Sequence, residues 1–408
     1  MNQIMTDTKK KLYPFEFIPA EFDKSWGKEV WTAADMGFVD SEISKGWLSG
    51  NSMSDLMETY LERVVGEDVY QYYGRQFPVF VRFVDVDGRT PLMVHPGDEV
   101  AMERYDVLGK AQLVYVTEAE ENAVLYLGFC REVSASEFYE RCMDGIVMEL
   151  LNAVKPKKGD FYIIEPGQVH AAAGKMKFVC VSESSDADFI MYDPSDAVVD
   201  KELRTMHISE AMDFINFAKY ASGCHCGCGH DHDHEHHHNE HHSDEKIVDT
   251  LAERPEFNIT RLNLTDPLHI YTEKFGSFIL YVCVEGELSV QVPSESSDGG
   301  KGMENYVIGK GESVLIPADM PDFFLVPRDC QTILLEVVTK PAEMLDEYID
   351  PNTEPYLEGE DYGLDDDDLD DDLEEGLGDN QDDNLDAGSG KFGISDTDFP
   401  CESGKGCC

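Results

Sequence analysis

Basic residues are few in this sequence. The chain of 408 residues has 32 Lys and Arg against 83 Asp and Glu, which gives a formal net charge of −51. Nucleic-acid phosphates and anionic lipids are bound through basic patches, so both are disfavoured as partners. No stretch approaches the roughly 18 apolar residues of a membrane span, and no apolar run follows the first basic residues as in a signal peptide. We therefore expect a soluble, unexported protein without nucleic-acid or membrane partners.

A disulfide pattern is also missing, although the sequence contains 11 cysteines. Cys130, Cys180 and Cys283 lie within apolar, strand-like runs, where a free thiol behaves as a small hydrophobic group. Disulfides persist in oxidising compartments, so this use of cysteine favours a reducing cytoplasm as the location.

Acidic residues are concentrated near the C-terminus. Between Glu358 and Asp386 there are 16 Asp and Glu and no Lys or Arg. This segment has no apolar periodicity and too little apolar content to offset the entropy lost on ordering. The sequence therefore predicts a disordered acidic tail over residues 346–408.

Short runs of β-branched and aromatic residues, separated by Gly and Pro turns, dominate the rest of the chain. They begin near residue 77 and resume after residue 255, and such runs are typical of an all-β sandwich or barrel. Apolar residues spaced at three and four predict helices over 54–65, 134–154 and 207–219, the first with Ser54 as its N-cap.

The two β-rich regions share a local pattern. KPKKGDFYIIEPGQVHA (155–171) and IGKGESVLIPADMPDFF (308–324) each run from Lys-x-Gly-acid through an apolar strand to a Pro and a polar turn. This internal repeat indicates two copies of one small barrel. The first copy keeps His170 at its mouth, whereas the second has Asp322 near that place and is expected to be structural.

Three ordered motifs carry a family resemblance. PLMVHPGDEVAMERYDVLGKAQLVYV (91–116), LLNAVKPKKGDFYIIEPGQVHAAAGK (150–175) and ESSDADFIMYDPSD (183–196) resemble the type I mannose-6-phosphate isomerases, and VEGELSV and GKGESVLIPA resemble their C-terminal barrel. The resemblance spans residues 10–345. It implies cupin-type (jelly-roll) barrels and a zinc-dependent interconversion of mannose 6-phosphate and fructose 6-phosphate, with a sugar phosphate as the substrate.

The fold expected from these observations is mostly β, with two cupin barrels, a few helices and the acidic tail. The predicted parts are a catalytic-type cupin domain over 10–205, a connecting helix over 206–221, a His/Cys-rich linker over 222–245, a C-terminal barrel over 250–345 and the tail over 346–408.

The resemblance implies four metal ligands, of which two match. His95 and His170 stand at the two histidine positions, whereas Met93 replaces a Gln and Gln112 replaces the acidic ligand. A thioether is a poor ligand for zinc, and an amide oxygen adds no negative charge. Ile190 stands where the family has a catalytic arginine, while Lys110 of the Gly-Lys pair is kept as the candidate catalytic residue.

A rebuilt zinc site is therefore the hypothesis for the first barrel. Side chains two residues apart in a strand share a face, so Gln168 and His170 would present a Gln-x-His pair. The proposed ligands are His95, His170, Gln112 and Gln168. The alternative for His170 is a buried, hydrogen-bonded histidine at the end of a strand.

The linker is a second candidate metal site. It holds nine of the 13 histidines and three cysteines, with Asp and Glu between them. Such density offers many overlapping ligand sets for divalent metals, and the alternative is a solvated tract with incidental affinity. The candidate ligands are Cys224, His225, Cys226, Cys228, His230, His232, His234 and His236.

Two functions remain open from the sequence. The first is a divergent sugar-phosphate isomerase with a weakened zinc site. The second is a catalytically inactive relative that binds a sugar or stores or senses metal through the linker. Met93, Gln112 and Ile190 favour the second, whereas the intact motifs around His95 and His170 favour the first.

Overall fold

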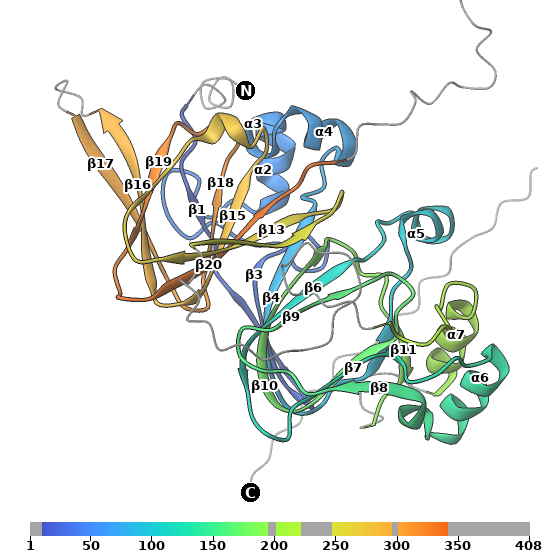
Figure 1. Cartoon of the computed structure of the whole chain (residues 1–408). Helices are drawn as coiled ribbons and strands as arrows, with labels where there is room; N and C mark the ends of the chain where they lie inside the picture. The colour runs from blue at the N-terminus through green and yellow to red at the C-terminus, as the bar shows by residue number, and fades with distance from the viewer. Residues whose placement is uncertain (1–9, 195–200, 222–246, 296–300, 342–408) are drawn as a thin grey trace, which may run out of the picture. The chain divides into compact units, whose positions relative to one another are not determined.

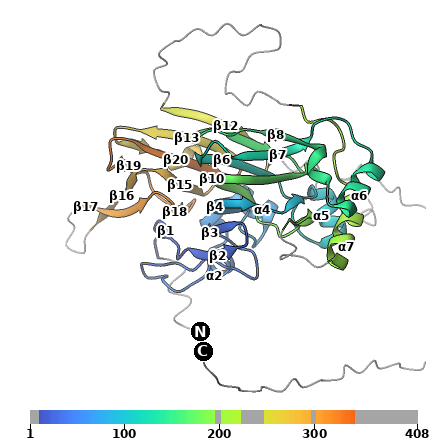
Figure 2. The same ribbon diagram turned by 90° about the horizontal axis from the view of Figure 1, so that it is seen from below.

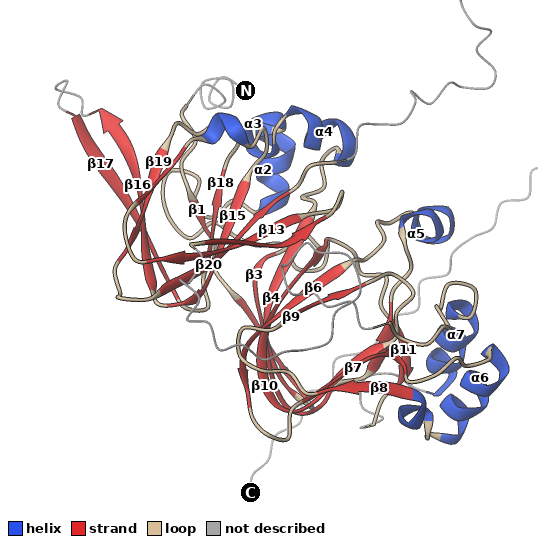
Figure 3. Cartoon of the chain, in the orientation of Figure 1, coloured by secondary structure: helices blue, strands red, loops and turns tan. Residues whose placement is uncertain are grey.

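The computed structural model describes residues 10–194, 201–221, 247–295 and 301–341. Strands dominate these residues, as Figure 3 shows, so the predicted mostly β fold is confirmed. The strands form one sheet of ten, one of six and one of four. The ten are β2 (Ala20–Lys24), β3 (Gly27–Ala33), β4 (Val79–Arg89), β5 (Leu92–Val94), β6 (Gln112–Ala119), β7 (Val124–Phe129), β8 (Leu151–Val154), β9 (Phe161–Ile164), β10 (His170–Glu183) and β11 (Phe189–Tyr192).

Strand β10 organises the ten-stranded sheet. It pairs antiparallel with β5 and β7 at its beginning and with β4 and β6 further along, so it has a neighbour on each side (Figure 2). This register sets His170 opposite Met93 of β5, and Ser182 opposite Gln112 of β6. The predicted metal-ligand segments are therefore brought to neighbouring strands by one central element.

The later part of the chain forms the other two sheets (Figure 1). The first strand of the chain joins them, because Phe15 of β1 pairs with Leu315 of β18. The six-stranded sheet contains β1 (Phe15–Glu16), β12 (Val248–Glu253), β13 (Asn258–Leu264), β15 (Ile279–Glu285), β18 (Ser313–Ile316) and β20 (Thr332–Val338). The four-stranded sheet contains β14 (Leu268–Ile270), β16 (Glu287–Glu295), β17 (Lys301–Gly309) and β19 (Phe323–Pro327).

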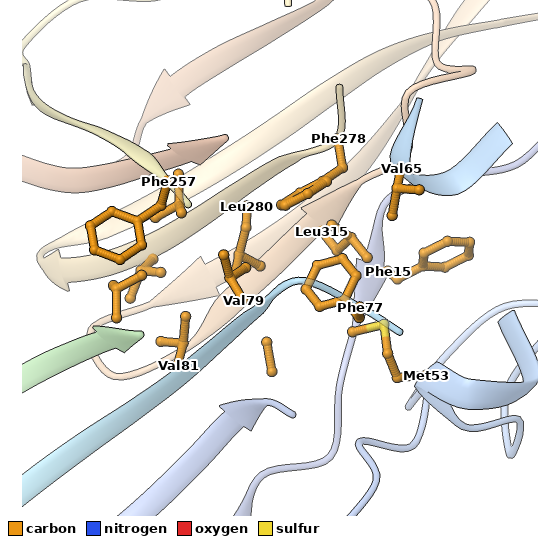
Figure 4. Close-up of a cluster of buried hydrophobic side chains, with 14 of the residues drawn as sticks. Phe15, Met53, Val65, Phe77, Val79, Val81, Phe257, Phe278, Leu280 and Leu315 are labelled. Atoms are coloured by element: carbon orange, nitrogen blue, oxygen red, sulfur yellow. The ribbon is translucent and has the colours of Figure 1, made fainter. Parts of the chain in front are cut away.

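One hydrophobic cluster joins the early and late strands. It includes Phe15, Phe77, Phe278 and Leu315, which are fully buried and lie together in Figure 4. The rings of Phe77 and Phe278 have their centroids 4.8 Å apart. Burial of large aromatic side chains is a main source of stability, so the two β regions are held together by a common core.

The helices differ from their predicted limits. The first is capped by Ser52, whose hydroxyl accepts the Asp55 N–H, and not by Ser54. The helix expected over 134–154 stops at Gly145, a left-handed C-cap, and is followed by a 3₁₀ turn and β8. The helix expected over 207–219 ends at Ala211. The elements are α2 (Met53–Tyr60), α3 (Glu62–Val65), α4 (Glu67–Tyr73), α5 (Asp98–Tyr105), α6 (Ala135–Asp144), α7 (Lys201–Ala211), η1 (Val147–Leu150) and η2 (Thr272–Lys274).

Two predictions lie outside the described residues, namely the metal-binding linker over 222–245 and the disordered tail over 346–408. Among the residues that the structure describes, no helix is long and apolar enough to cross a membrane.

Replacing Phe15 with alanine tests the common core. Because Phe15 is fully buried, we expect Phe15→Ala to lower the free energy of unfolding by about 3–5 kcal/mol. Phe38→Ala is the matched control, since that ring is 68% exposed, and it should cost less than about 1 kcal/mol. Urea unfolding followed by tryptophan fluorescence measures both. Equal losses for the two variants would contradict the packing described above.

Candidate active site

Two buried imidazoles form the centre of the candidate site. His95 directly follows β5, and His170 begins β10, which pairs with β5. Their ring centroids are 4.8 Å apart with an angle of 50° between the ring planes. His95 is 2% exposed and His170 is 7% exposed. The structure therefore brings together the two histidines that the sequence singled out.

The hydrogen bonds of the two rings fix where their protons lie. Nδ1 of His95 is 3.2 Å from the carbonyl oxygen of Ala187 and 3.1 Å from Oδ1 of Asp188. Nδ1 of His170 is 3.0 Å from the carbonyl oxygen of Gln168. Because these oxygens only accept hydrogen bonds, we assign the proton of each ring to Nδ1. The Nε2 lone pair of each ring is then available to a ligand.

Both imidazoles are neutral near pH 7. Burial lowers the pKa of His95, and it lowers the pKa of His170 to about 3 with help from the neighbouring His95. Nε2 of His95 is buried and has no hydrogen-bond partner within the described part of the chain. Nε2 of His170 lies 3.4 Å from the amide nitrogen of Gln112.

A buried lysine and an aspartate lie beside His95. Nζ of Lys110 is 2.6 Å from Oδ1 of Asp188, and Lys110 is 1% exposed whereas the Asp188 side chain is 36% exposed. Burial by itself would raise the pKa of Asp188, but the charge of Lys110 and the hydrogen bond from His95 outweigh it and hold that pKa well below its usual value. Asp188 is therefore an anion shared by the two side chains.

The HPGDE turn positions Lys110. The carbonyl of Pro96 accepts the N–H of Lys110, and the carboxylate of Asp98 accepts the N–H of Gly109 at 2.8 Å. Gly109 fits because a Cβ there would lie 2.5 Å from the backbone nitrogen of Asp98. Lys110 was predicted from its Gly-Lys motif, whereas Asp188 was not predicted as a site residue. Its only signal was a carboxylate two residues before Ile190 in DFIMYD.

Gln112 lies at the base of the site and faces a buried arginine. Its side-chain oxygen is 3.4 Å from a terminal nitrogen of Arg82 and 3.1 Å from the Cys180 sulfur. Arg82 also pairs with the buried Glu29 at 3.3 Å. Arg82 and Glu29 were missed because polar residues within a strand pattern are ordinarily assigned to the solvent face.

A small cavity adjoins Gln112 and His170, and a separate, wider cleft lies along the segment 184–186 that precedes Asp188. The cavity, of about 50 Å³, is lined by Arg82, Gln112, His170 and Met93, and has room for water but not for a sugar. The cleft is about 420 Å³ and includes Arg75 and Asp186 in its lining. That volume is in the range of small-molecule pockets, and the N–H of Asp188 donates to the carbonyl of Asp186.

Gln168 does not join the imidazoles. It lies in the turn before β10, so the predicted strand pairing of Gln168 with His170 is wrong. Its side-chain oxygen accepts the N–H of Glu165 at 3.3 Å, and only its backbone carbonyl contacts His170. Ile190 lies opposite Met93, and its N–H donates to Nδ1 of His207.

The donor set fits zinc only in part. Two neutral imidazoles with anchored Nδ1 atoms suit the metal, but Gln112 turns its amide nitrogen to His170, while its oxygen, the atom that would bind a metal, accepts from Arg82. Within the described ranges, however, no group of three or more His, Cys, Asp or Glu is placed to hold a metal ion. The guanidinium beside Gln112 also repels a cation. These residues are suited to a weakly held ion.

Glu183 anchors the start of the strand that carries Gln112. Its carboxylate accepts the N–H of Ala111 at 2.8 Å, and the residue is 2% exposed. Burial raises the pKa of Glu183 to about 8, with a further contribution from Asp98. The side chain is therefore mostly protonated at pH 7.

The fold and sequence of the chain are similar to those of known mannose-6-phosphate isomerases. No protein-family model matches the chain. It is 25% identical over 300 residues to mannose-6-phosphate isomerase ManA of Bacillus subtilis, covering 73% of this chain and 85% of that protein. It is 22% identical over 241 residues to mannose-6-phosphate isomerase of Streptococcus mutans, covering 59% and 68%.

Solved structures agree with this fold. The mannose 6-phosphate isomerase of Bacillus subtilis superposes with a TM-score of 0.63 at 21% identity, covering 80% of this chain and 99% of that one. A mutant of phosphomannose isomerase from Salmonella typhimurium gives 0.59 at 15% identity, covering 81% and 100%. These comparisons confirm the resemblance to the mannose-6-phosphate isomerases that the sequence motifs indicated.

The protonation of Glu183 predicts a pH-dependent stability. A carboxyl group whose pKa is about 8 in the folded state and about 4.3 when unfolded stabilises the fold at low pH, and this stabilisation is lost as pH rises toward 8. Glu183→Gln cannot ionise and should remove this loss, on the order of 3 kcal/mol between pH 5 and pH 8. Urea unfolding at both pH values measures it. The exposed Glu58→Gln should retain the wild-type pH dependence, and a Glu183→Gln curve parallel to wild type would refute the prediction.

Proposed function

We propose that the protein is a mannose-6-phosphate isomerase-like enzyme of weakened activity that acts on a sugar phosphate. The observation that carries this proposal is the pair of neutral imidazoles with anchored Nδ1 atoms, in which Nε2 of His95 has no partner among the described residues and Nε2 of His170 lies 3.4 Å from the Gln112 amide nitrogen. His95, His170 and Gln112 would hold a zinc ion, which when bound polarises a carbonyl oxygen. Gln168 is left out of the set because its side chain contacts the backbone of Glu165.

Lys110 is the proposed catalytic residue. Interconversion of an aldose and a ketose moves a proton between two adjacent carbons, and negative charge develops on oxygen during that transfer. The ammonium group of Lys110 has three donors, and a single carboxylate, that of Asp188, faces it. Its remaining donors can stabilise the developing charge. The cleft beside Asp186 is the proposed space for the substrate.

We extend the proposal to the architecture and location. Two cupin barrels are supported by the repeated sequence pattern, because its apolar halves form β9 and β18 and each strand is followed by a Pro-containing turn. The predicted domain limits then describe two related units that share a core, with the linker between them. The use of cysteine supports a cytoplasmic protein.

Arg82 favours a second candidate function. A buried guanidinium beside Gln112, together with Ile190 in place of an arginine, suits a relative that has lost turnover. Such a protein would bind a sugar, or would store or sense divalent metals through the His/Cys-rich linker. The linker ligands named above belong to this alternative.

A coupled assay on mannose 6-phosphate tests the enzyme proposal. We expect the zinc-supplied protein to form fructose 6-phosphate slowly, and His95→Ala and His170→Ala to lower kcat/KM by roughly 100-fold or more, since each removes an imidazole from the metal site. His269→Ala is the control, because that histidine stacks on Phe324 at 4.4 Å in the four-stranded sheet. It should leave the rate unchanged.

The assay also separates the two functions. A wild-type rate equal to the uncatalysed background removes the enzyme and leaves the binding protein. A measurable rate that is the same in His95→Ala and His269→Ala would place the chemistry elsewhere.

Restoring an acidic residue tests the weakness of the metal site. Gln112→Glu adds a carboxylate beside Nε2 of His170, and we expect tighter zinc binding, by roughly tenfold or more, because the charge attracts the cation. The competing effect is the guanidinium of Arg82, which faces the same side-chain oxygen. Arg82→Met combined with Gln112→Glu should therefore bind zinc more tightly still. Unchanged affinity in both variants, measured by chelator competition, would contradict this site.

A further inference from the structure

One carboxylate oxygen links the two functional halves of the candidate site. Oδ1 of Asp188 is 2.6 Å from Nζ of Lys110 and 3.1 Å from Nδ1 of His95. The three side chains come from separate places: His95 follows β5, Lys110 precedes β6 and Asp188 precedes β11. Lys110 and Asp188 are 78 positions apart in the sequence. This contact therefore exists only in the folded chain.

The contact determines what His95 presents to a ligand. The Asp188 carboxylate and the Ala187 carbonyl both accept from Nδ1, so the Nε2 lone pair faces away from them. That lone pair is buried and has no partner among the described residues. Carboxylates that accept from the far nitrogen of a histidine orient the ring and strengthen its other nitrogen as a metal ligand.

We infer that Asp188 is a positioning residue, which orients His95 toward a zinc ion and is itself held in place by Lys110. The inference rests on the proposed function, because it takes zinc as the ligand of His95 and His170. Asp188 acts on the proposed metal site through an imidazole and not as a direct ligand. Because it also neutralises Lys110, the pair adds no net charge to the site.

A purely structural role is the alternative for Asp188. A buried ammonium without a partner is strongly unfavourable, so Asp188 could serve only to neutralise Lys110. The two roles differ in one respect. Only a positioning role predicts that the loss of the carboxylate weakens zinc binding at His95 when the charge of Lys110 is removed with it.

Nitrogen NMR of the full-length chain labelled with ¹⁵N-histidine tests the inference. His95→Ala identifies the His95 signals, and a chelator buffer sets the free zinc concentration. The metal-free wild type should carry the His95 proton on Nδ1, and zinc should shift Nε2. In Asp188→Asn, and in Lys110→Met with Asp188→Asn, the zinc concentration at the midpoint should rise roughly 10- to 100-fold. The double variant excludes an unpaired lysine as the cause.

Asp144→Asn is the matched control, because it removes a carboxylate charge at an exposed position at the end of α6, away from the candidate site. Its midpoint should equal that of the wild type. A His95 proton on Nε2 in the metal-free wild type, or an unchanged midpoint in both Asp188 variants, would overturn the positioning role while leaving the proposed function intact. Zinc that shifts neither His95 nor His170 in the wild type would instead overturn the proposed metal site.

Discussion

The pairing of β10 is the constraint on which the rest of this structure depends. The strand has β5 and then β4 on one side and β7 and then β6 on the other, so its register fixes four neighbours together. A slip of one residue would turn every side chain of a strand to the opposite face. His170 at its start and Cys180 near its end are therefore set in relation to Met93, Arg82 and the segment that carries Gln112.

The net charge of the candidate site depends on which of its charged side chains are buried in pairs. The chain as a whole is strongly acidic, yet its candidate site contains two neutral imidazoles and two buried cations, Lys110 and Arg82. Each cation has a carboxylate beside it, Asp188 for Lys110 and Glu29 for Arg82. A buried charge is tolerated when an opposite charge lies beside it, and each of these two pairs is neutral as a whole. The net result is a site with little attraction for a divalent ion from formal charge, in which ligand geometry has to supply the affinity.

The residues that differ from the isomerase motifs lie next to one another in the folded chain. Gln112, in place of an acid, accepts from Arg82, while Ile190, in place of an arginine, pairs with Met93, which replaces a glutamine. Asp188 lies two residues before Ile190 and takes up the charge of Lys110. These substituted positions therefore lie beside one another in the folded chain, although they are far apart in the sequence.

The sequence by itself determined the strand-rich class and the family resemblance, and it singled out His95, His170, Lys110 and Gln112 as candidates. These were visible because they are local: alternation of apolar residues, turn residues and short motifs lie within a few positions of one another. The predicted helix limits were wrong where a capping residue, Ser52 or Gly145, sets the end of the helix. Gln168 was predicted to lie on a strand, but that strand begins two residues later, at His170. Only the tertiary structure decided that Asp188 contacts Lys110 and His95, and that Arg82 faces inward to Glu29 and Gln112. Such contacts join residues far apart in the chain, and they depend on strand register and on which face of the sheet is enclosed, which no local pattern specifies.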